Sequence, residues 1–271
     1  MTEHVGPKGY EELRQVTPFA GVVLADNPGT MTLDGTNTWI LRDDPARRQA
    51  VVIDPGPNSE SHLGAVLQAA GRVELILLTH GHLDHSEGAR RLHELTSAPV
   101  RALDPGHRYG AEGITEGSAL EAAGLAIEVW ATPGHTSDSL CFVLPAAAGS
   151  RPAAVLTGDT ILGRGTTVVA HPDGVLADYL ASLRRLSTLS GVIVLPGHGP
   201  ELPDAGMAAQ AYLAHREQRL QQVREVVSAG GADLTPRDVV ERVYADVDAA
   251  LWPAAELSVR AQLAYLRADR P

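Results

Sequence analysis

Cysteine and lysine are almost missing from this chain of 271 residues. Cys141 is the only cysteine, so the chain cannot form an internal disulfide, and a reducing cytoplasm suits it. Because Cys141 lies in the apolar run 140–144, we expect it to be packed in the core rather than reactive. Lys8 is the only lysine, and the formal net charge is −11. An acidic surface without a lysine cluster argues against avid, nonspecific nucleic-acid binding, although a small arginine-lined track remains compatible with it.

The sequence also lacks an apolar run long enough to span a membrane. Its first residues have neither the basic start nor the apolar stretch of a signal peptide. We therefore expect a cytoplasmic protein with no membrane partner. The hydrophobic fraction of 44% is enough for a buried core, and the length suits one large domain with an appendage.

Short apolar runs bounded by turn residues dominate the first two hundred residues, and they predict strands. The predicted strands are residues 19–25, 38–41, 50–53, 73–79, 99–103, 125–131, 140–144, 153–156 and 191–195. Helical spacing of apolar residues predicts helices over 59–70, 86–96 and 175–189. Residues 1–18 are polar and interrupted by proline, so we expect a loosely attached arm there.

After residue 203 the pattern changes to helices alone. The spacing predicts one long helix over 207–229, a second that starts at 235 with proline in its first turn, and a third over 254–266. We therefore predict a first domain of residues 1–203 and a C-terminal helical domain of residues 204–271.

The segment Thr79-His80-Gly81-His82-Leu83-Asp84-His85 follows a predicted buried strand. Side chains two residues apart on an extended chain point the same way, so His80 and His82 can reach one metal ion together. Asp84 and His85 follow where the chain turns into a helix, and they can face a second ion beside the first. Imidazole nitrogens suit zinc, and a carboxylate adds charge and an oxygen ligand. A chance histidine cluster is disfavoured, because the rest of the chain supplies matching ligands.

Three further predicted strands lead into a histidine or an aspartate beside glycine or proline, namely His135, Asp159 and His198. Glycine or proline next to such a residue lets the backbone turn sharply at the edge of a sheet. Together with the four ligands above this makes seven, which is too many for a closed structural zinc site. The number suits two adjacent ions that keep open or water-filled positions.

We predict that one ion is bound by His80, His82 and His135, and the other by Asp84, His85 and His198. Asp159 then bridges the two ions with one oxygen each. A hydroxide held between two ions stays nucleophilic at neutral pH, and it can attack a carbonyl carbon or a phosphorus. The ions also polarise the substrate oxygen. Asp84 is placed to orient the hydroxide or to carry its proton, and is therefore the predicted catalytic residue.

Several residues near these motifs allow two interpretations. Asp54 ends a predicted strand and is either a ligand or a turn-forming residue behind the ligands, and we favour the second. Asn37 either bonds a substrate or completes a turn. His171 follows Asp159 closely and is a candidate substrate contact at the rim, against the general expectation of a packed or surface histidine.

The long predicted helix carries three arginines, Arg216, Arg219 and Arg224. They form either a solvated face or a track for phosphate groups, and we favour the solvated face.

The residues His80-Gly81-His82-Leu83-Asp84-His85, with His135, Asp159 and His198, resemble the pattern of the metallo-β-lactamase superfamily over about residues 19–203. This resemblance implies an α/β fold, the four-layer αββα sandwich, and the metal roles assigned above. Asn27-Pro28-Gly29 followed by Gly35-Thr36-Asn37-Thr38 further resembles the β-lactamase-like protein 2 group. Members of that group also have a C-terminal, winged-helix-like tail, which the C-terminal helices here resemble.

The resemblance does not fix the substrate. In the β-lactamase-like protein 2 group, one activity is endonuclease cleavage of single-stranded RNA, and related fungal proteins hydrolyse acyl-carrier thioesters. Glyoxalase II shares the seven-ligand pattern but holds glutathione partly with lysines, which this chain lacks apart from Lys8. True β-lactamases lack the bridging aspartate that Asp159 supplies, so β-lactamase activity is the weakest alternative.

We therefore predict a cytoplasmic hydrolase with two Zn²⁺ ions, although another divalent metal is compatible with the ligands. Its predicted substrate is a small-molecule thioester or activated ester, with single-stranded RNA as the alternative. A binding module with a dead metal site is disfavoured, because every ligand is present. The sequence leaves the oligomeric state open.

Overall fold

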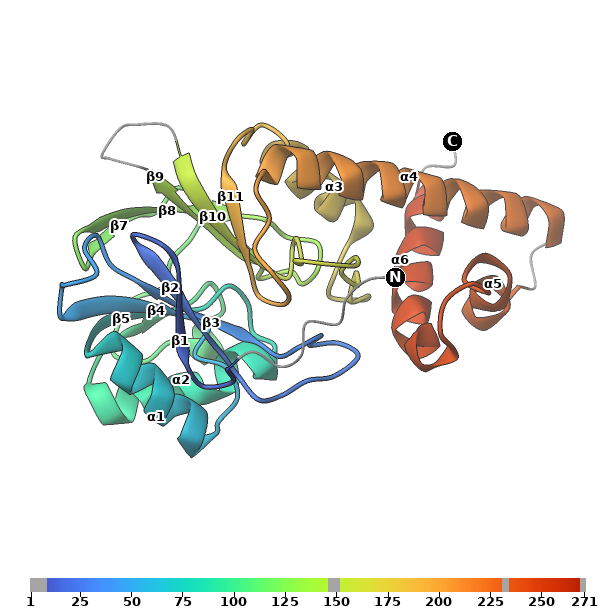
Figure 1. The fold of residues 1–271 in the computed structure, drawn as a ribbon. Coiled ribbons are helices and arrows are strands. Elements are labelled where there is room, and N and C mark those ends of the chain that lie inside the picture. The colour runs from blue at the N-terminus through green and yellow to red at the C-terminus, as the bar shows by residue number, and fades with distance from the viewer. Residues whose placement is uncertain (1–8, 146–151, 231–233, 269–271) are drawn as a thin grey trace.

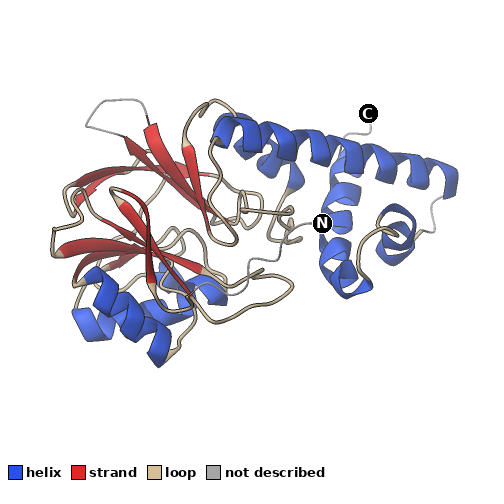
Figure 2. Cartoon of the chain, in the orientation of Figure 1, coloured by secondary structure: helices blue, strands red, loops and turns tan. Residues whose placement is uncertain are grey.

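The computed structural model describes residues 9–145, 152–230 and 234–268. Two sheets face each other, and helices cover their outer sides (Figures 1 and 2). The first sheet contains, in spatial order, β1 (Leu13–Thr17), β2 (Ala20–Leu24), β3 (Asn37–Leu41), β4 (Gln49–Ile53), β5 (Arg72–Leu77) and β6 (Val100–Arg101). The second contains β11 (Ile193–Pro196), β10 (Pro152–Gly158), β9 (Leu140–Pro145), β8 (Leu125–Ala131) and β7 (Ala119–Ala122).

The central strands are buried on both faces, which explains why their sequences are continuously apolar. In β3, Trp39 and Leu41 point into the core between the sheets, whereas Ile40 packs on the helix side. The helices α1 (Glu60–Ala70) and α2 (Leu83–Thr96) contribute Leu63 and Leu92 to that outer cluster. This arrangement is the predicted αββα sandwich.

On the second sheet, the outer layer is formed by α3 (Leu176–Leu186) and by the first part of α4 (Ala205–Gly230). Beyond the sandwich, α4 continues to α5 (Pro236–Val243) and α6 (Trp252–Ala268) (Figure 1). These three helices share a small core of their own that includes Val223, Val240 and Val259. The predicted C-terminal helices are thus present. Among the described residues, no helix combines the length and apolarity needed to cross a bilayer.

Two edge strands were not predicted. Part of the expected N-terminal arm, Leu13–Thr17, is β1, which pairs antiparallel with β2. Arg14 also forms an ion pair with Glu201 at 2.9 Å. The other unpredicted strand is β7, an edge strand of the second sheet, which pairs with β8. Both strands expose alternate or successive side chains to solvent, so neither has the apolar run that indicates a buried strand. The rest of the predicted arm, residues 1–8, lies outside the described residues.

Cys141 of β9 is fully buried, as predicted. Burial raises the pKa of its thiol to about 11, so only about one thiol in ten thousand is ionised at pH 7. We expect the native protein to react with a disulfide reagent at least about 100-fold more slowly than the urea-unfolded protein, because the thiolate is the reactive form. The single cysteine makes the absorbance of the released thiol a direct measure. Comparable rates in the two states would contradict this prediction.

Candidate metal centre

The predicted ligands come together at one edge of the sandwich, where strands of both sheets end. The sheets are joined there by two backbone hydrogen bonds, from Leu140 N to Thr79 O at 2.7 Å and from Asn37 N to Gly197 O at 2.8 Å. The histidine motif follows β5, and its His82 is the N-cap residue of α2. Asp84 and His85 therefore lie in the first turn of α2, because this helix begins at Leu83, three residues earlier than predicted.

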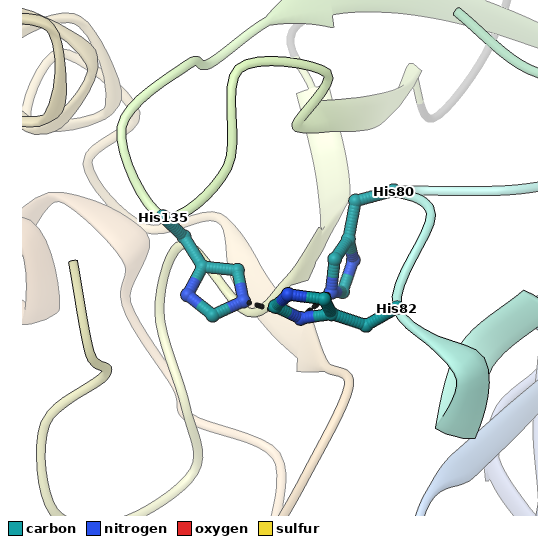
Figure 3. Close-up of side chains that lie close together, drawn as sticks. All are labelled: His80, His82 and His135. Carbon is teal, nitrogen blue, oxygen red and sulfur yellow. Dashed lines mark hydrogen bonds between the residues drawn. The ribbon is translucent and has the colours of Figure 1, made fainter. Parts of the chain in front are cut away.

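His80, His82 and His135 form the first ligand group. His80 Nε2 lies 3.0 Å from His82 Nδ1, and His135 Nε2 lies 3.1 Å from the same nitrogen. Figure 3 shows the three rings turned toward one another, with His135 approaching from the β8–β9 connection. These ligand atoms are close enough together to hold one metal ion.

Asp84, His85 and His198 form the second ligand group. His198 Nε2 lies 3.1 Å from Asp84 Oδ2 and 3.2 Å from His85 Nε2. Asp159 lies beside both groups: its Oδ1 is 3.4 Å from His85 Nε2, and its Oδ2 is 3.5 Å from His198 Nε2 and 3.7 Å from His135 Nε2. Asp159 also forms a third possible group with His80 and His85, which overlaps the other two. The geometry therefore gathers all seven predicted ligands at one edge, and their division between two ions stays a prediction.

Hydrogen bonds on the far side of the His85, His135 and His198 rings fix which nitrogen faces the centre. Nδ1 of His135 lies 2.7 Å from Val168 O, and Nδ1 of His198 lies 3.1 Å from Gly35 O. A carbonyl can only accept, so both Nδ1 atoms carry a proton, and Nε2 presents a lone pair in each neutral ring. His85 Nδ1 likewise donates to Asp54 Oδ2 at 2.8 Å. Lone pairs that face each other at about 3 Å repel each other, and a shared proton or a metal ion between them relieves this repulsion.

The carboxylates reinforce this demand for positive charge. Burial disfavours a charge on His198, but Asp159 and Asp84 outweigh it and raise the pKa of His198 to about 11. Burial opposes the charge of Asp159 too, yet His198 and His85 hold its pKa well below the usual value. Asp159 Oδ1 is buried and has no hydrogen-bond partner among the described residues. An ionised, unpartnered oxygen among imidazole lone pairs fits a site for divalent metal ions.

Asp54 supports the centre from behind, which confirms the favoured interpretation of this residue. It has a left-handed backbone (φ 51°) at the end of β4. Besides the bond to His85, its carboxylate accepts from Thr79 N at 2.8 Å and Thr79 Oγ1 at 2.7 Å. Thr79 Oγ1 is also 3.0 Å from His80 Nδ1, so one carboxylate orients a ligand of each group.

The two predicted substrate contacts have different surroundings. Asn37 is almost fully buried, and its amide nitrogen donates to Pro196 O at 3.0 Å and Gly199 O at 2.8 Å. These bonds hold the turn that carries His198. His171 is half-buried in the segment after Val169. Contact of either residue with a substrate stays a prediction.

The expectation of a solvated arginine face on α4 is wrong for Arg216, which is 4% exposed. Its guanidinium donates to the Thr167 carbonyl and lies over the ring of Tyr179. Arg219 is partly buried, and Arg224 is exposed. The burial of Arg216 was not predicted, because the spacing of apolar residues in a helix does not reveal which of its polar residues contacts a distant segment of the chain.

Comparison with known proteins agrees with this geometry. The model of the metallo-beta-lactamase superfamily matches residues 31–198, and that of the beta-lactamase associated winged helix domain matches residues 235–270. The atrochrysone carboxyl ACP thioesterase of Aspergillus fumigatus is 32% identical over 252 residues, which cover 86% of this chain and 76% of that protein. The beta-lactamase-like protein 2 homolog of Drosophila melanogaster is 30% identical over 267 residues, covering 91% and 87%.

Among solved structures, a beta-lactamase domain protein from Burkholderia ambifaria has the same fold, with a TM-score of 0.79 at 21% identity. The alignment covers 97% of this chain and 91% of that one, so it includes the C-terminal helices. The superfamily match spans more than half of the sequence and contains every predicted ligand. The chain is therefore a hydrolytic enzyme that belongs to the metallo-beta-lactamase superfamily.

Proposed function

We propose that this enzyme is a binuclear, zinc-dependent hydrolase of thioesters or similarly activated esters. The observation that supports the metal assignment is the position of Asp159, whose Oδ1 lies near His85 and whose Oδ2 lies near both His198 and His135. In this proposal His80, His82 and His135 hold one ion, and Asp84, His85 and His198 hold the other. Imidazole with carboxylate suits zinc and also iron, so metal analysis of the purified protein tests the identity of the ion.

Zinc, when bound, would supply a water of lowered pKa and a positive charge that polarises the substrate carbonyl. The protein contributes orientation and proton transfer. Burial works against ionisation of Asp84, but its hydrogen bond with His198 keeps the pKa of the carboxyl below the ordinary value. Asp84 is thus ionised at neutral pH, and its side chain is 29% exposed. It can accept the proton of an attacking water and release it to solvent.

The thioester assignment is supported by the chain's similarity to the Aspergillus thioesterase and by its charge. A net charge of −11 with a single lysine does not favour binding of a polyanion. Cleavage of single-stranded RNA is the second candidate. It is favoured by the resemblance to the β-lactamase-like protein 2 group, which extends through the C-terminal helices.

Two parallel assays separate the candidates. A short acyl thioester and a fluorescent single-stranded RNA are each incubated with the zinc-loaded enzyme, with a chelator, and with the Asp84→Ala variant. We expect thioester turnover that falls at least about 100-fold in both controls, with the RNA left intact. RNA cleavage that is lost in both controls, without thioester turnover, would instead establish the ribonuclease.

Two further assignments accompany this proposal. We place the border between the catalytic domain and the C-terminal domain at residues 203 and 204, just before α4 begins. We also propose a cytoplasmic location, in keeping with a single buried thiol and no need for disulfides. Limited proteolysis and cell fractionation test these two assignments.

A further inference from the structure

Arg216 connects the C-terminal helix α4 to a segment of the catalytic domain. It is buried, its Nη2 donates to the carbonyl of Thr167, and its guanidinium carbon lies 5.2 Å from the centre of the Tyr179 ring. A second tail helix reaches the same segment, because Val169 N donates to Ser258 Oγ of α6 at 3.4 Å. Two of the C-terminal helices, α4 and α6, therefore hold the segment 167–170 in place.

The segment 167–170 in turn surrounds His135. Val168 O accepts the proton of His135 Nδ1 at 2.7 Å, and Thr167 Oγ1 lies 3.2 Å from the same nitrogen. Ala170 N donates to the backbone carbonyl of His135 at 3.0 Å. These contacts set both the tautomer and the direction of the ring, so a shift of residues 167–168 would turn His135 Nε2 away from the first ligand group.

Tyr179 links Arg216 to a second predicted ligand, Asp159. Its hydroxyl donates to Thr160 O at 2.7 Å, next to Asp159. It also packs tightly against the residue before His135, since a Cβ on Gly134 would lie 2.3 Å from the Tyr179 Cα. The guanidinium of Arg216 therefore stands behind the two ligands that come from the second sheet and its loops, His135 and Asp159.

Stability alone does not explain a buried arginine at this place. Within the part of the chain that the structure describes, the buried Arg216 Nε has no hydrogen-bond partner, and an incompletely paired buried charge is costly. The planar guanidinium can stack on the Tyr179 ring and donate to the Thr167 carbonyl at the same time, so it is well suited to holding this carbonyl in one direction.

We propose that Arg216 is a positioning residue, through which the C-terminal domain orients His135 and sets the affinity of the metal centre. The inference rests on the metal centre in the proposed function, and it is independent of which substrate is hydrolysed.

Arg219 provides a matched control on the same helix. Its guanidinium lies 4.7 Å from the centre of the Tyr244 ring, and its Nη1 donates to Val243 O at 2.7 Å. It thus makes the same two kinds of contact as Arg216, but within the C-terminal domain. Arg219 also bonds Gln222 Oε1 at 3.2 Å and lies 3.5 Å from Asp246 Oδ2, so Arg219→Met removes at least as many contacts as Arg216→Met at a different place.

The experiment compares wild type, both Met variants and Arg216→Lys as full-length proteins. Zinc affinity is measured by competition with a chromophoric chelator, ligand geometry by the visible spectrum of the cobalt-substituted protein, and folding by thermal denaturation. We expect Arg216→Met to bind its weaker ion about 10- to 100-fold less tightly with an altered cobalt spectrum. Arg219→Met should keep both properties of wild type, and Arg216→Lys should recover part of the affinity.

Wild-type affinity and spectrum in a folded Arg216→Met protein would overturn the inference, as would equal losses in both Met variants. If Arg216→Met does not fold, the comparison of Arg216→Lys with Arg219→Met decides by the same two measurements. A wild-type protein that binds no metal would refute the proposed metal centre itself, and is thereby distinguished from a failure at Arg216 alone.

Discussion

Replacing Asp159 with alanine should reduce the zinc content from about two ions to about one and lower thioesterase activity at least about 100-fold. Asp159 is 3.4 Å from His85 Nε2 through one oxygen and 3.7 Å from His135 Nε2 through the other. Without this carboxylate, the repulsion between two dications in a buried site is no longer offset, and the second ion is lost.

Elemental analysis of dialysed protein measures this effect, and Asp138→Ala is the matched control. Asp138 is a carboxylate near the same edge, because its Oδ2 would lie 3.2 Å from a Cβ on Gly81, but it belongs to none of the three groups able to hold a metal. The Asp138→Ala variant loses the same charge as Asp159→Ala and should retain about two zinc ions. Two ions bound with unchanged affinity in Asp159→Ala would rule out the bridge.

The Gly197→Ala variant should disrupt the centre although it removes no ligand. A Cβ at this position would lie 2.7 Å from Asp159 Oδ1 and 2.7 Å from His85 Cε1. Both neighbours are ligands that are held by other contacts, including the bond from His85 to Asp54. They must therefore move, and a displacement of about 1 Å can cost on the order of 100-fold in activity. We expect that loss, together with weaker zinc binding.

Chelator competition and thioester kinetics test this variant beside Gly64→Ala. Gly64 lies in α1, and a Cβ there would meet nothing within 4 Å. The same substitution should therefore leave metal binding unchanged and strengthen the helix slightly. Wild-type zinc affinity in Gly197→Ala would contradict this prediction, because it would mean that the site accommodates the added Cβ without moving Asp159 or His85.

The cluster of candidate metal ligands could be found from the sequence because much of its spacing is local. His80, His82, Asp84 and His85 lie within six residues after an apolar strand, and each remaining ligand follows a strand beside glycine or proline. The central strands were predicted for a related reason, since burial on both faces leaves an unbroken apolar run. The edge strands β1 and β7 expose part of their surface, so their pairing depends on neighbours that sequence patterns do not reveal.

The sequence by itself determined which residues are able to bind metal, the sandwich that brings strand ends to one edge, and the change to helices after residue 203. Only the tertiary structure decided which imidazole nitrogen faces the centre, because the Val168 and Gly35 carbonyls that fix His135 and His198 are backbone atoms from other segments. It also decided that Arg216 lies buried behind His135. Such contacts join residues far apart in the chain, and their partners are chosen by packing geometry rather than by residue type or spacing.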